Sequence, residues 1–158
     1  MLENVQCNRN LIVLRTFSKW AGLAGLRIGY GVFPSEFVPM LMKAKQPYNI
    51  SSAAEQAAIV TMKNLPKVSK NVNRIINQRG GLFQALEQIS WLDVYPSKAN
   101  FMLCRVNGIS ALEVKQLLRK QGILIRHFDQ PGLSDHIRIS IGTKDQIETL
   151  VAALKGIR

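Results

Sequence analysis

The sequence is poor in cysteine, proline, aromatic residues and acidic residues. Among 158 residues it carries 2 Cys, 6 Pro and 10 Asp or Glu, and Phe, Trp and Tyr make up 7%. Two cysteines cannot build a disulfide framework, and neither Cys7 nor Cys104 has a Cys or His neighbour at metal-ligand spacing. We therefore expect two free thiols in a reducing compartment, with Cys104 on a buried strand, and no metal site.

Long hydrophobic runs are also lacking. A membrane-spanning helix needs roughly 20 apolar residues, and the longest run here, 33–41, contains two prolines and a glutamate. The first ten residues have neither the apolar core of a secretory signal nor the Arg-rich pattern of a transit peptide. We expect a cytoplasmic protein with no membrane partner, or a plastid protein if a longer N-terminus carries a transit peptide. The 47% hydrophobic content is that of an ordinary globular chain and excludes disorder.

Acidic residues are so few that the net charge is +11, and such an excess is typical of nucleic-acid binding. The charges are scattered, however. Residues 1–76 hold ten basic and three acidic side chains, and residues 77–158 hold eleven and seven. No run of five or six like charges and no RNP-like pattern occurs. We rank nucleic acid last among the partners and expect a solvated basic surface with a few side chains held for anionic small molecules.

Hydrophobic periodicity predicts the secondary structure. The predicted strands cover 10–16, 27–33, 92–95, 101–106, 123–128 and 137–141, and the predicted helices cover 36–45, 53–63, 66–89, 110–120 and 145–154. Ser51 or Ser52 can cap the helix at 53–63. Gly80 and Gly81 predict a bend in the helix at 66–89, and Gly122 ends the helix at 110–120.

These elements predict a chain of two unlike parts. Residues 1–70 resemble part of a larger α/β domain, because two buried strands alone cannot make a sheet with covered faces. Residues 71–90 form an interdomain helix in this interpretation. Residues 91–158 have enough strands and helices for a small α+β domain of their own.

One segment carries chemistry. Lys19 directly follows a buried strand, and strand ends are where α/β folds place their ligands. The hydroxyls of Thr16 and Ser18 suit a phosphate, and Arg27 can bring a planar guanidinium to the same anion. An amine beside phosphate ligands is what pyridoxal 5′-phosphate requires. On spacing alone, an ordinary surface lysine at a strand end remains the more common alternative.

The segment TFSKWAGLAGLRIGYG resembles, nearly residue for residue, the cofactor-lysine segment of fold-type I pyridoxal phosphate enzymes. It is most similar to the pattern S-K-x-x-x-L-A-G-L-R-x-G of histidinol-phosphate aminotransferases. The further matching segments are QPYNIS at 46–51, PSKANFML at 96–103, GILIRHF at 122–128 and HIRISIGT at 136–143. Five ordered matches over nearly the whole chain make the resemblance specific.

The resemblance implies a role for each matching residue. Lys19 would be the amine that bonds to the aldehyde of pyridoxal 5′-phosphate and the catalytic acid and base. Thr16, Ser18 and Arg27 would bind the cofactor phosphate.

The same resemblance assigns the substrate contacts. Arg138 would bind the anionic group of the substrate, with Arg126 as its helper, and Asn100 would lie where the small domain approaches the substrate.

The implied fold is α/β, namely the C-terminal fragment of a fold-type I transferase with the end of the large-domain sheet and a small α+β domain. The implied reaction is amino transfer from L-histidinol phosphate to 2-oxoglutarate in histidine biosynthesis, by a homodimer. The family's members are about twice as long, and the missing part holds the aspartate for the ring nitrogen, so we expect this chain alone to be weak or inactive. The alternatives are a threonine-phosphate decarboxylase, another class I/II aminotransferase, and a non-catalytic fragment.

Overall fold

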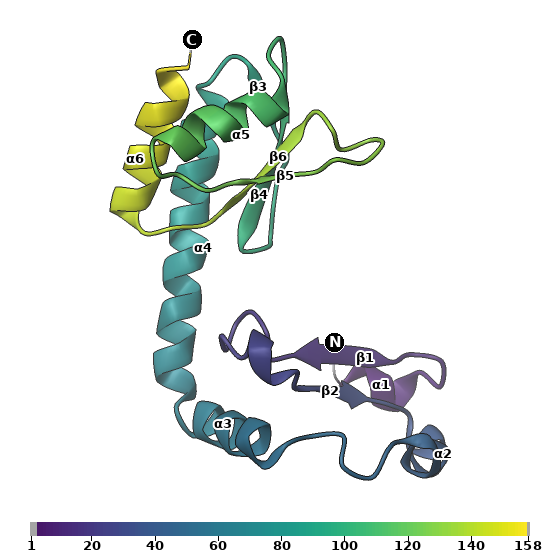
Figure 1. The fold of residues 1–158 in the computed structure, drawn as a ribbon. Coiled ribbons are helices and arrows are strands. Elements are labelled where there is room, and N and C mark those ends of the chain that lie inside the picture. Colours follow the sequence, from purple (N-terminus) through teal and green to yellow (C-terminus); the bar gives the residue numbers. More distant parts are fainter. Residues whose placement is uncertain (1–2, 158) are drawn as a thin grey trace. The chain divides into compact units, whose positions relative to one another are not determined.

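The protein is described by a computed structural model that covers residues 3–157 and divides into two compact units, Met1–Lys70 (unit 1) and Asn71–Arg158 (unit 2). Figure 1 shows the elements of both, and each unit is described by itself. Residues 71–90, expected to form an interdomain helix, belong to the same compact unit as residues 91–158. The assignment of domains to these ranges stays a prediction.

Unit 1 is built on a two-stranded antiparallel ribbon of β1 (Val13–Thr16) and β2 (Gly29–Val32). Both strands fall within the predicted ranges, but the prediction of a buried first strand is wrong. Val13 is the one buried residue of β1, and the side chain of Leu14 is 72% exposed. The reason is that a ribbon of two strands has too few neighbours to cover its faces.

Short helical elements complete unit 1. They are α1 (Asn4–Cys7), the 3₁₀ turns η1 (Ala24–Leu26) and η2 (Ser35–Phe37), α2 (Val38–Ala44) and α3 (Ser52–Lys63). The single helix predicted over 36–45 is thus a 3₁₀ turn followed by α2, with Pro39 in the first turn of α2, where its missing N–H is not needed. Ser51 is the residue that caps α3, since its Oγ accepts the N–H of Ala54 at 3.2 Å.

Unit 2 is a four-stranded antiparallel sheet with three helices. Its elements are α4 (Leu65–Glu87, which begins in unit 1), β3 (Leu92–Val94), β4 (Phe101–Val106), α5 (Ala111–Lys120), β5 (Arg126–His127), β6 (His136–Ser140) and α6 (Lys144–Lys155). The strand order is β3-β4-β6-β5, and every neighbouring pair is antiparallel.

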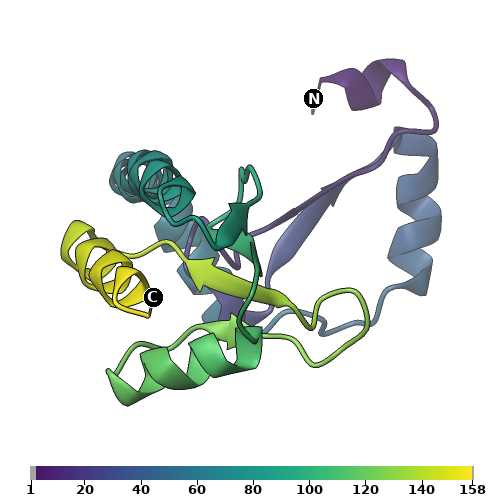
Figure 2. The same cartoon turned by 90° about the horizontal axis from the view of Figure 1, so that it is seen from above.

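Alternation along β4 decides which face of this sheet is buried. Met102, Cys104 and Val106 are buried and belong to the core that the sheet shares with α4, α5 and α6. Figure 2 shows the sheet and these three helices from above. Phe101, Leu103 and Arg105 point the other way, to what we call the outer face. The expectation that Cys104 lies on a buried strand is confirmed, since it is 0% exposed.

The helix α4 is continuous through Gly80 and Gly81, and the bend expected there stays a prediction. Leu82 and Leu86 just beyond the pair are fully buried in the core. The strand predicted over 123–128 shrinks to the two residues of β5, since only these pair with β6. Gly122 does follow the end of α5, with φ +78°, a conformation that favours glycine. Among residues 3–157, no helix is both long and apolar enough to span a membrane.

Candidate active site

The segment around Lys19 lies at one end of the β1–β2 ribbon. Thr16 pairs with Gly29, and the N–H of Phe17 donates to the carbonyl of Ile28 at 3.2 Å, which extends the pairing by one residue. Ser18 leaves the ribbon at this end and Arg27 enters it there. The pairing of two strands thus brings together residues that the sequence separates by a glycine-rich turn.

Glycine at position 29 is needed for this close pairing. A Cβ built on Gly29 would lie 2.6 Å from the carbonyl oxygen of Arg15, which no side chain tolerates without a shift of the backbone. The final glycine of the L-R-x-G pattern therefore has a steric reason in this fold.

The hydroxyls of Thr16 and Ser18 form a small network. Thr16 Oγ1 accepts the N–H of Ser18 at 3.0 Å and donates to Ser18 Oγ at 2.8 Å. The Ser18 proton is then left to donate to an outside acceptor. In this arrangement Ser18 has a hydroxyl proton free and Thr16 holds that hydroxyl in position; that both residues contact a phosphate stays a prediction.

Aromatic side chains that the sequence analysis did not single out support this end of the ribbon. The ring N–H of Trp20 donates to the carbonyl of Thr16 at 2.6 Å. The ring of Phe17, itself buried, lies 5.1 Å from that of Trp20 and 5.9 Å from that of Tyr30. Because Phe17 lies between Thr16 and Ser18 in sequence, its burial turns the polar side chains on either side of it away from the small core of unit 1.

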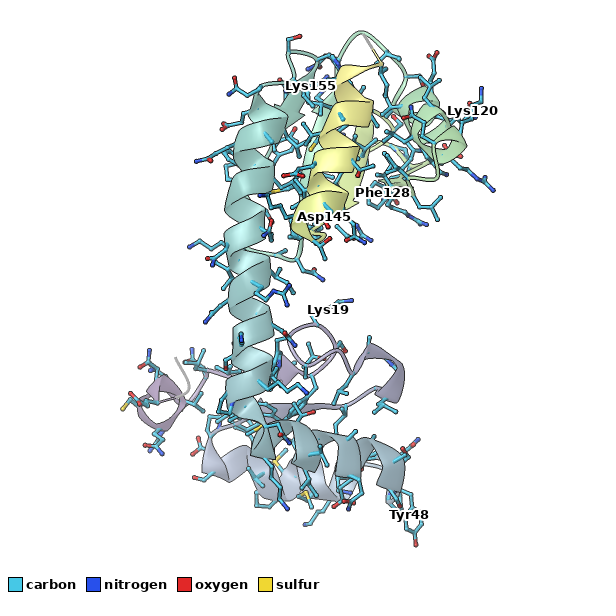
Figure 3. The ribbon with its side chains drawn as sticks, turned by 90° about the vertical axis from the view of Figure 1, so that its left-hand side faces the viewer. Lys19, Tyr48, Lys120, Phe128, Asp145 and Lys155 are labelled. Carbon is cyan, nitrogen blue, oxygen red and sulfur yellow. The ribbon has the colours of Figure 1, made fainter. Side chains whose placement is uncertain are left out.

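Lys19 and Arg27 are both exposed at the surface of unit 1, and Figure 3 shows Lys19 projecting from its loop. Arg27 has φ +53°, the one positive φ of a non-glycine residue in the described part of the chain, and its Nη1 donates to the carbonyl of Ala24 at 3.3 Å. Strained backbone of this kind gathers at functional sites. Within residues 3–157 neither side chain forms an ion pair.

The donor set fits pyridoxal 5′-phosphate. Ser18 supplies a hydroxyl, Arg27 a guanidinium and Lys19 an amine, and no carboxylate pairs with them in the part of the chain described. Donors and cations without an acidic partner suit a phosphate, and an amine suits an aldehyde.

The two arginines expected to bind substrate lie together in unit 2. Arg126 on β5 and Arg138 on β6 are directly opposite each other in the ladder. Arg138 lies on the outer face, because its neighbours Ile137 and Ile139 are buried in the core. Its guanidinium carbon is 5.1 Å from the centre of the Phe101 ring.

Asn100 directly precedes β4, where that strand pairs with the C-terminal end of β6. Its backbone carbonyl accepts the N–H of Ile141 at 3.0 Å, which continues the β4–β6 ladder, and its side chain is exposed. The structure thus places Asn100 near the end of β6 and shows no contact that assigns its side chain a role.

A second polar group on the outer face was not predicted. His136 bonds through Nδ1 to Asp135 Oδ1 at 2.6 Å and through Nε2 to the Tyr95 hydroxyl at 3.3 Å, and Arg105 Nε donates to Asp135 Oδ2 at 2.7 Å. Desolvation acts to raise the pKa of the Asp135 carboxyl, but the hydrogen bonds from Arg105 and His136 outweigh it and hold the pKa below its usual value. No sequence spacing signals this group, because it needs β3, β4 and β6 side by side.

No group of three or more His, Cys, Asp or Glu side chains within residues 3–157 could hold a metal ion. The predicted site residues thus form two groups. Thr16, Ser18, Lys19 and Arg27 lie at one end of the ribbon in unit 1, and Arg126 and Arg138 lie opposite each other in unit 2.

Comparison with known proteins identifies the class. The family model for aminotransferase class I and II matches residues 2–154, so the chain belongs to that family. Its fold is that of the fold-type I aminotransferases, as the sequence predicts: it matches histidinol-phosphate aminotransferase from Clostridium acetobutylicum with a TM-score of 0.87 and 27% identity, over 99% of this chain and 48% of that one.

Two curated relatives are enzymes of one type. The chain is 46% identical over 153 residues to the chloroplastic histidinol-phosphate aminotransferase of Nicotiana tabacum, and 44% identical over 160 residues to the histidinol-phosphate aminotransferase of Roseiflexus castenholzii. These matches cover 96% and 99% of this chain but 37% and 43% of the two relatives. The chain thus spans about two fifths of the length of the curated relatives it matches.

Two further solved structures bear on ligands. One, 26% identical with a TM-score of 0.79 over 99% of this chain and 44% of its own, is histidinol-phosphate aminotransferase from Sinorhizobium meliloti in complex with pyridoxal-5′-phosphate. The other, L-threonine-O-3-phosphate decarboxylase from Porphyromonas gingivalis, has a TM-score of 0.87 over 99% of this chain and 49% of its own, and at 24% identity it shares the fold alone.

Proposed function

We propose that this chain forms part of a pyridoxal 5′-phosphate-dependent aminotransferase that transfers the amino group of L-histidinol phosphate to 2-oxoglutarate. The observation that carries the proposal is the end of the ribbon, where Ser18 and Lys19 follow β1 and Arg27 comes shortly before β2, with no carboxylate paired to them in the described residues. The relatives at 46% and 44% identity support the choice of substrate.

The residues of unit 1 would hold the cofactor. Ser18 donates its free proton to the cofactor phosphate, and Thr16 keeps Ser18 in place through the 2.8 Å bond. Arg27 supplies a permanent positive charge to the same phosphate. Lys19 Nζ would be the amine that holds the aldehyde end of the cofactor, and as general base and acid it would take the proton from the substrate Cα and return it. The cofactor, when bound, supplies the electron-withdrawing ring that makes this proton acidic.

The arginines of unit 2 would bind the anionic end of the substrate. A phosphate monoester carries up to two negative charges, and Arg126 and Arg138 together offer two. The class of substrate is therefore a small anion, and the proposal names no nucleic acid or membrane partner. We further propose that the complete enzyme is a homodimer of the cytoplasm or, as in the tobacco relative named chloroplastic, of the plastid.

The test of the cofactor role is chemical trapping. The protein, completed with the remaining portion of the fold, is incubated with pyridoxal 5′-phosphate and reduced with borohydride, and peptides are mapped by mass spectrometry. We expect the phosphopyridoxyl group on the peptide that contains Lys19, and none in Lys19→Ala. Labelling of Lys43 or Lys45 in place of Lys19 would contradict the assignment. The matched control Lys45→Ala should label as the parent does.

The test of the substrate role compares two arginines in an enzyme completed with the remaining portion of the fold. Arg138→Leu should raise the KM for histidinol phosphate at least tenfold, whereas Arg27→Leu should first weaken binding of the cofactor. An unchanged KM in Arg138→Leu would show that this residue does not bind the substrate anion.

A second candidate function is decarboxylation of L-threonine O-3-phosphate, the alternative that the sequence leaves open; the Porphyromonas gingivalis enzyme of that name shows that the same fold can carry it. Release of CO₂ from L-threonine O-3-phosphate, with no glutamate formed from 2-oxoglutarate, would favour it over amino transfer. Other class I/II aminotransferases remain alternatives, separated by their amino donors, as does a non-catalytic chain, which would fail the trapping test.

A further inference from the structure

Two like charges face each other on the outer face of unit 2. Arg126 and Arg138 are register partners in the β5–β6 ladder. Side chains directly opposite in an antiparallel pair start from Cβ atoms only about 4.5–5.5 Å apart, and like charges in that position repel. The ion pairs of the described residues involve Arg105, His136 and Lys144, so no carboxylate there neutralises either guanidinium.

Aromatic rings take the place of a carboxylate. The guanidinium carbon of Arg126 lies 5.7 Å from the centre of the Phe128 ring, and that of Arg138 lies 6.0 Å from the same ring. Arg138 also lies 5.1 Å from the centre of the Phe101 ring. All three distances are within the range of a cation–π contact. Phe128 (labelled in Figure 3) is thus shared by both arginines.

A ring and a carboxylate hold an arginine in different ways. A carboxylate binds the N–H groups at the edge of the guanidinium and so occupies them. A phenylalanine ring has no hydrogen-bond acceptor in its plane and attracts the cation over its face, which leaves the N–H groups free. Two guanidinium groups held by rings keep their N–H donors available for a ligand. Because the two cations repel each other, binding of an anion between them is favoured.

We propose that Phe101 and Phe128 are positioning residues that hold Arg138 and Arg126 with their N–H groups free for a phosphate-type anion. Phe128, the shared ring, fixes the two guanidinium groups relative to each other, and Phe101 fixes Arg138 alone. The inference rests on the proposed role of the arginine pair in binding the substrate. It adds that the two phenylalanine rings position this pair before the anion binds.

The experiment follows the arginine side-chain Nε–H signals of the ¹⁵N-labelled 158-residue chain by NMR while inorganic phosphate is added at constant ionic strength. We expect the signals of Arg126 and Arg138 to shift together. The signal of Arg105, whose Nε is bonded to Asp135 at 2.7 Å, should stay in place and serves as an internal control.

Removing a ring should weaken phosphate binding by about 2- to 5-fold, because this is the effect expected from the loss of one exposed cation–π contact. This is the expectation for Phe128→Leu and for Phe101→Leu, with about 4- to 25-fold for the double variant, the product of the two effects. Phe128→Tyr and Phe101→Tyr keep the ring face and should bind as the parent does. Phe37→Leu, an exposed phenylalanine of unit 1, is the matched control and should change nothing.

Two results would overturn the proposal. One is a folded double variant with the phosphate affinity of the parent, and the other is a parent chain whose Arg126 and Arg138 signals do not respond to phosphate. If a leucine variant loses its native circular dichroism, the methionine variants replace it, since they remove the ring with less loss of volume.

This test can fail separately from the proposed function. If the rings matter for phosphate but borohydride labels no Lys19, the amino-transfer proposal fails and the positioning role stands. If Lys19 is labelled but the ring variants bind phosphate normally, only the positioning role fails.

Discussion

The two units differ in how completely each buries its own apolar side chains. In unit 2 a continuous core extends from Leu82 on α4 to Leu154 on α6 and includes the inner face of the sheet. In unit 1 the buried cluster consists of Phe17, Ile28 and Ala54. Large apolar side chains of unit 1 such as Leu14, 72% exposed, and Met40, 67% exposed, face solvent.

The difference follows from sheet size. Four strands with helices on one face enclose a core, whereas a two-stranded ribbon does not. The two groups of predicted site residues therefore have different supports. Arg126 and Arg138 lie on a sheet with a closed core of its own, and Lys19 lies at the end of a ribbon whose apolar side chains are largely exposed.

Separating the two units is the strongest test of this comparison. Residues 71–158 expressed alone should melt in one cooperative transition, because their core is closed. Residues 1–70 alone should show no cooperative melt and should aggregate through exposed apolar side chains and unpaired strand edges. Circular dichroism on heating measures both. A sigmoidal melt of residues 1–70 would show that unit 1 is stabilised by more than its visible core.

The two cysteines should differ strongly in their rate of alkylation. Burial raises the pKa of the Cys104 thiol from 9.0 to about 12, whereas Cys7 is exposed. Since the thiolate is the reactive form, iodoacetamide should label Cys7 quickly and Cys104 only when the fold opens. Mass mapping of labelled peptides at intervals measures the two rates. Equal rates would show that unit 2 opens easily.

The same thiol predicts a pH dependence for unit 2. The unfolded thiol ionises near pH 9 and the folded one near pH 12. The contribution of Cys104 to stability is therefore intact below pH 9 and is lost as the pH rises from 9 towards 12. In Cys104→Ala this part of the loss of stability between pH 9 and pH 12 should disappear, as thermal melts of the two proteins over this pH range would show.

Matched leucine truncations compare the cores of the two units. Leu118→Ala removes a fully buried side chain of α5 and should cost about 2–5 kcal/mol of the free energy of unfolding. Leu14→Ala removes a side chain that is 72% exposed and should change it by less than about 0.5 kcal/mol. Urea denaturation of the full chain, monitored by the circular dichroism of unit 2, measures the effect of Leu118→Ala. A small effect at Leu118 would contradict the closed core.

Backbone strain at Arg27 can be relieved. Arg27→Gly removes a side chain from a residue with φ +53° and should stabilise the ribbon by up to about 1 kcal/mol. The readout is slower hydrogen exchange of the Phe17 amide, which donates to Ile28. Binding of the cofactor should weaken at the same time, since the guanidinium is lost. Arg15→Gly, in β1 without positive φ, should loosen the ribbon instead.

The smallest effect is expected at Arg126. Arg126→Leu removes one of two opposed like charges and should stabilise unit 2 by a few tenths of a kcal/mol, about the lower limit for cross-strand pairs. The gain should shrink in high salt, because screening already weakens the repulsion. Arg105→Leu is the control and should not stabilise, since it loses the bond to Asp135. A loss of stability in Arg126→Leu would show that its contact with Phe128 outweighs the repulsion.

Much of unit 2 could be predicted from sequence because its signals are local. The alternation of buried and exposed residues along 101–106 and 137–141 specifies strands with one covered face. Glycine at position 122 marks the end of a helix through the backbone conformation of a single residue, and in unit 1 the capping serine at position 51 does so through a single hydrogen bond. The burial of the first strand was predicted wrongly, because an apolar run indicates what a strand would bury and not whether a neighbour is there to cover it.

The order Thr16-Phe17-Ser18-Lys19 and its distance from Arg27 were readable in the sequence alone, because a strand end, a turn and a returning strand are consecutive in the chain. The opposition of Arg126 and Arg138, the ring of Phe128 shared between them, and the link from Tyr95 through His136 and Asp135 to Arg105 were decided by the tertiary structure. Which residues face each other across a sheet depends on the pairing register, and that register is set when the core closes on one face of every strand at once.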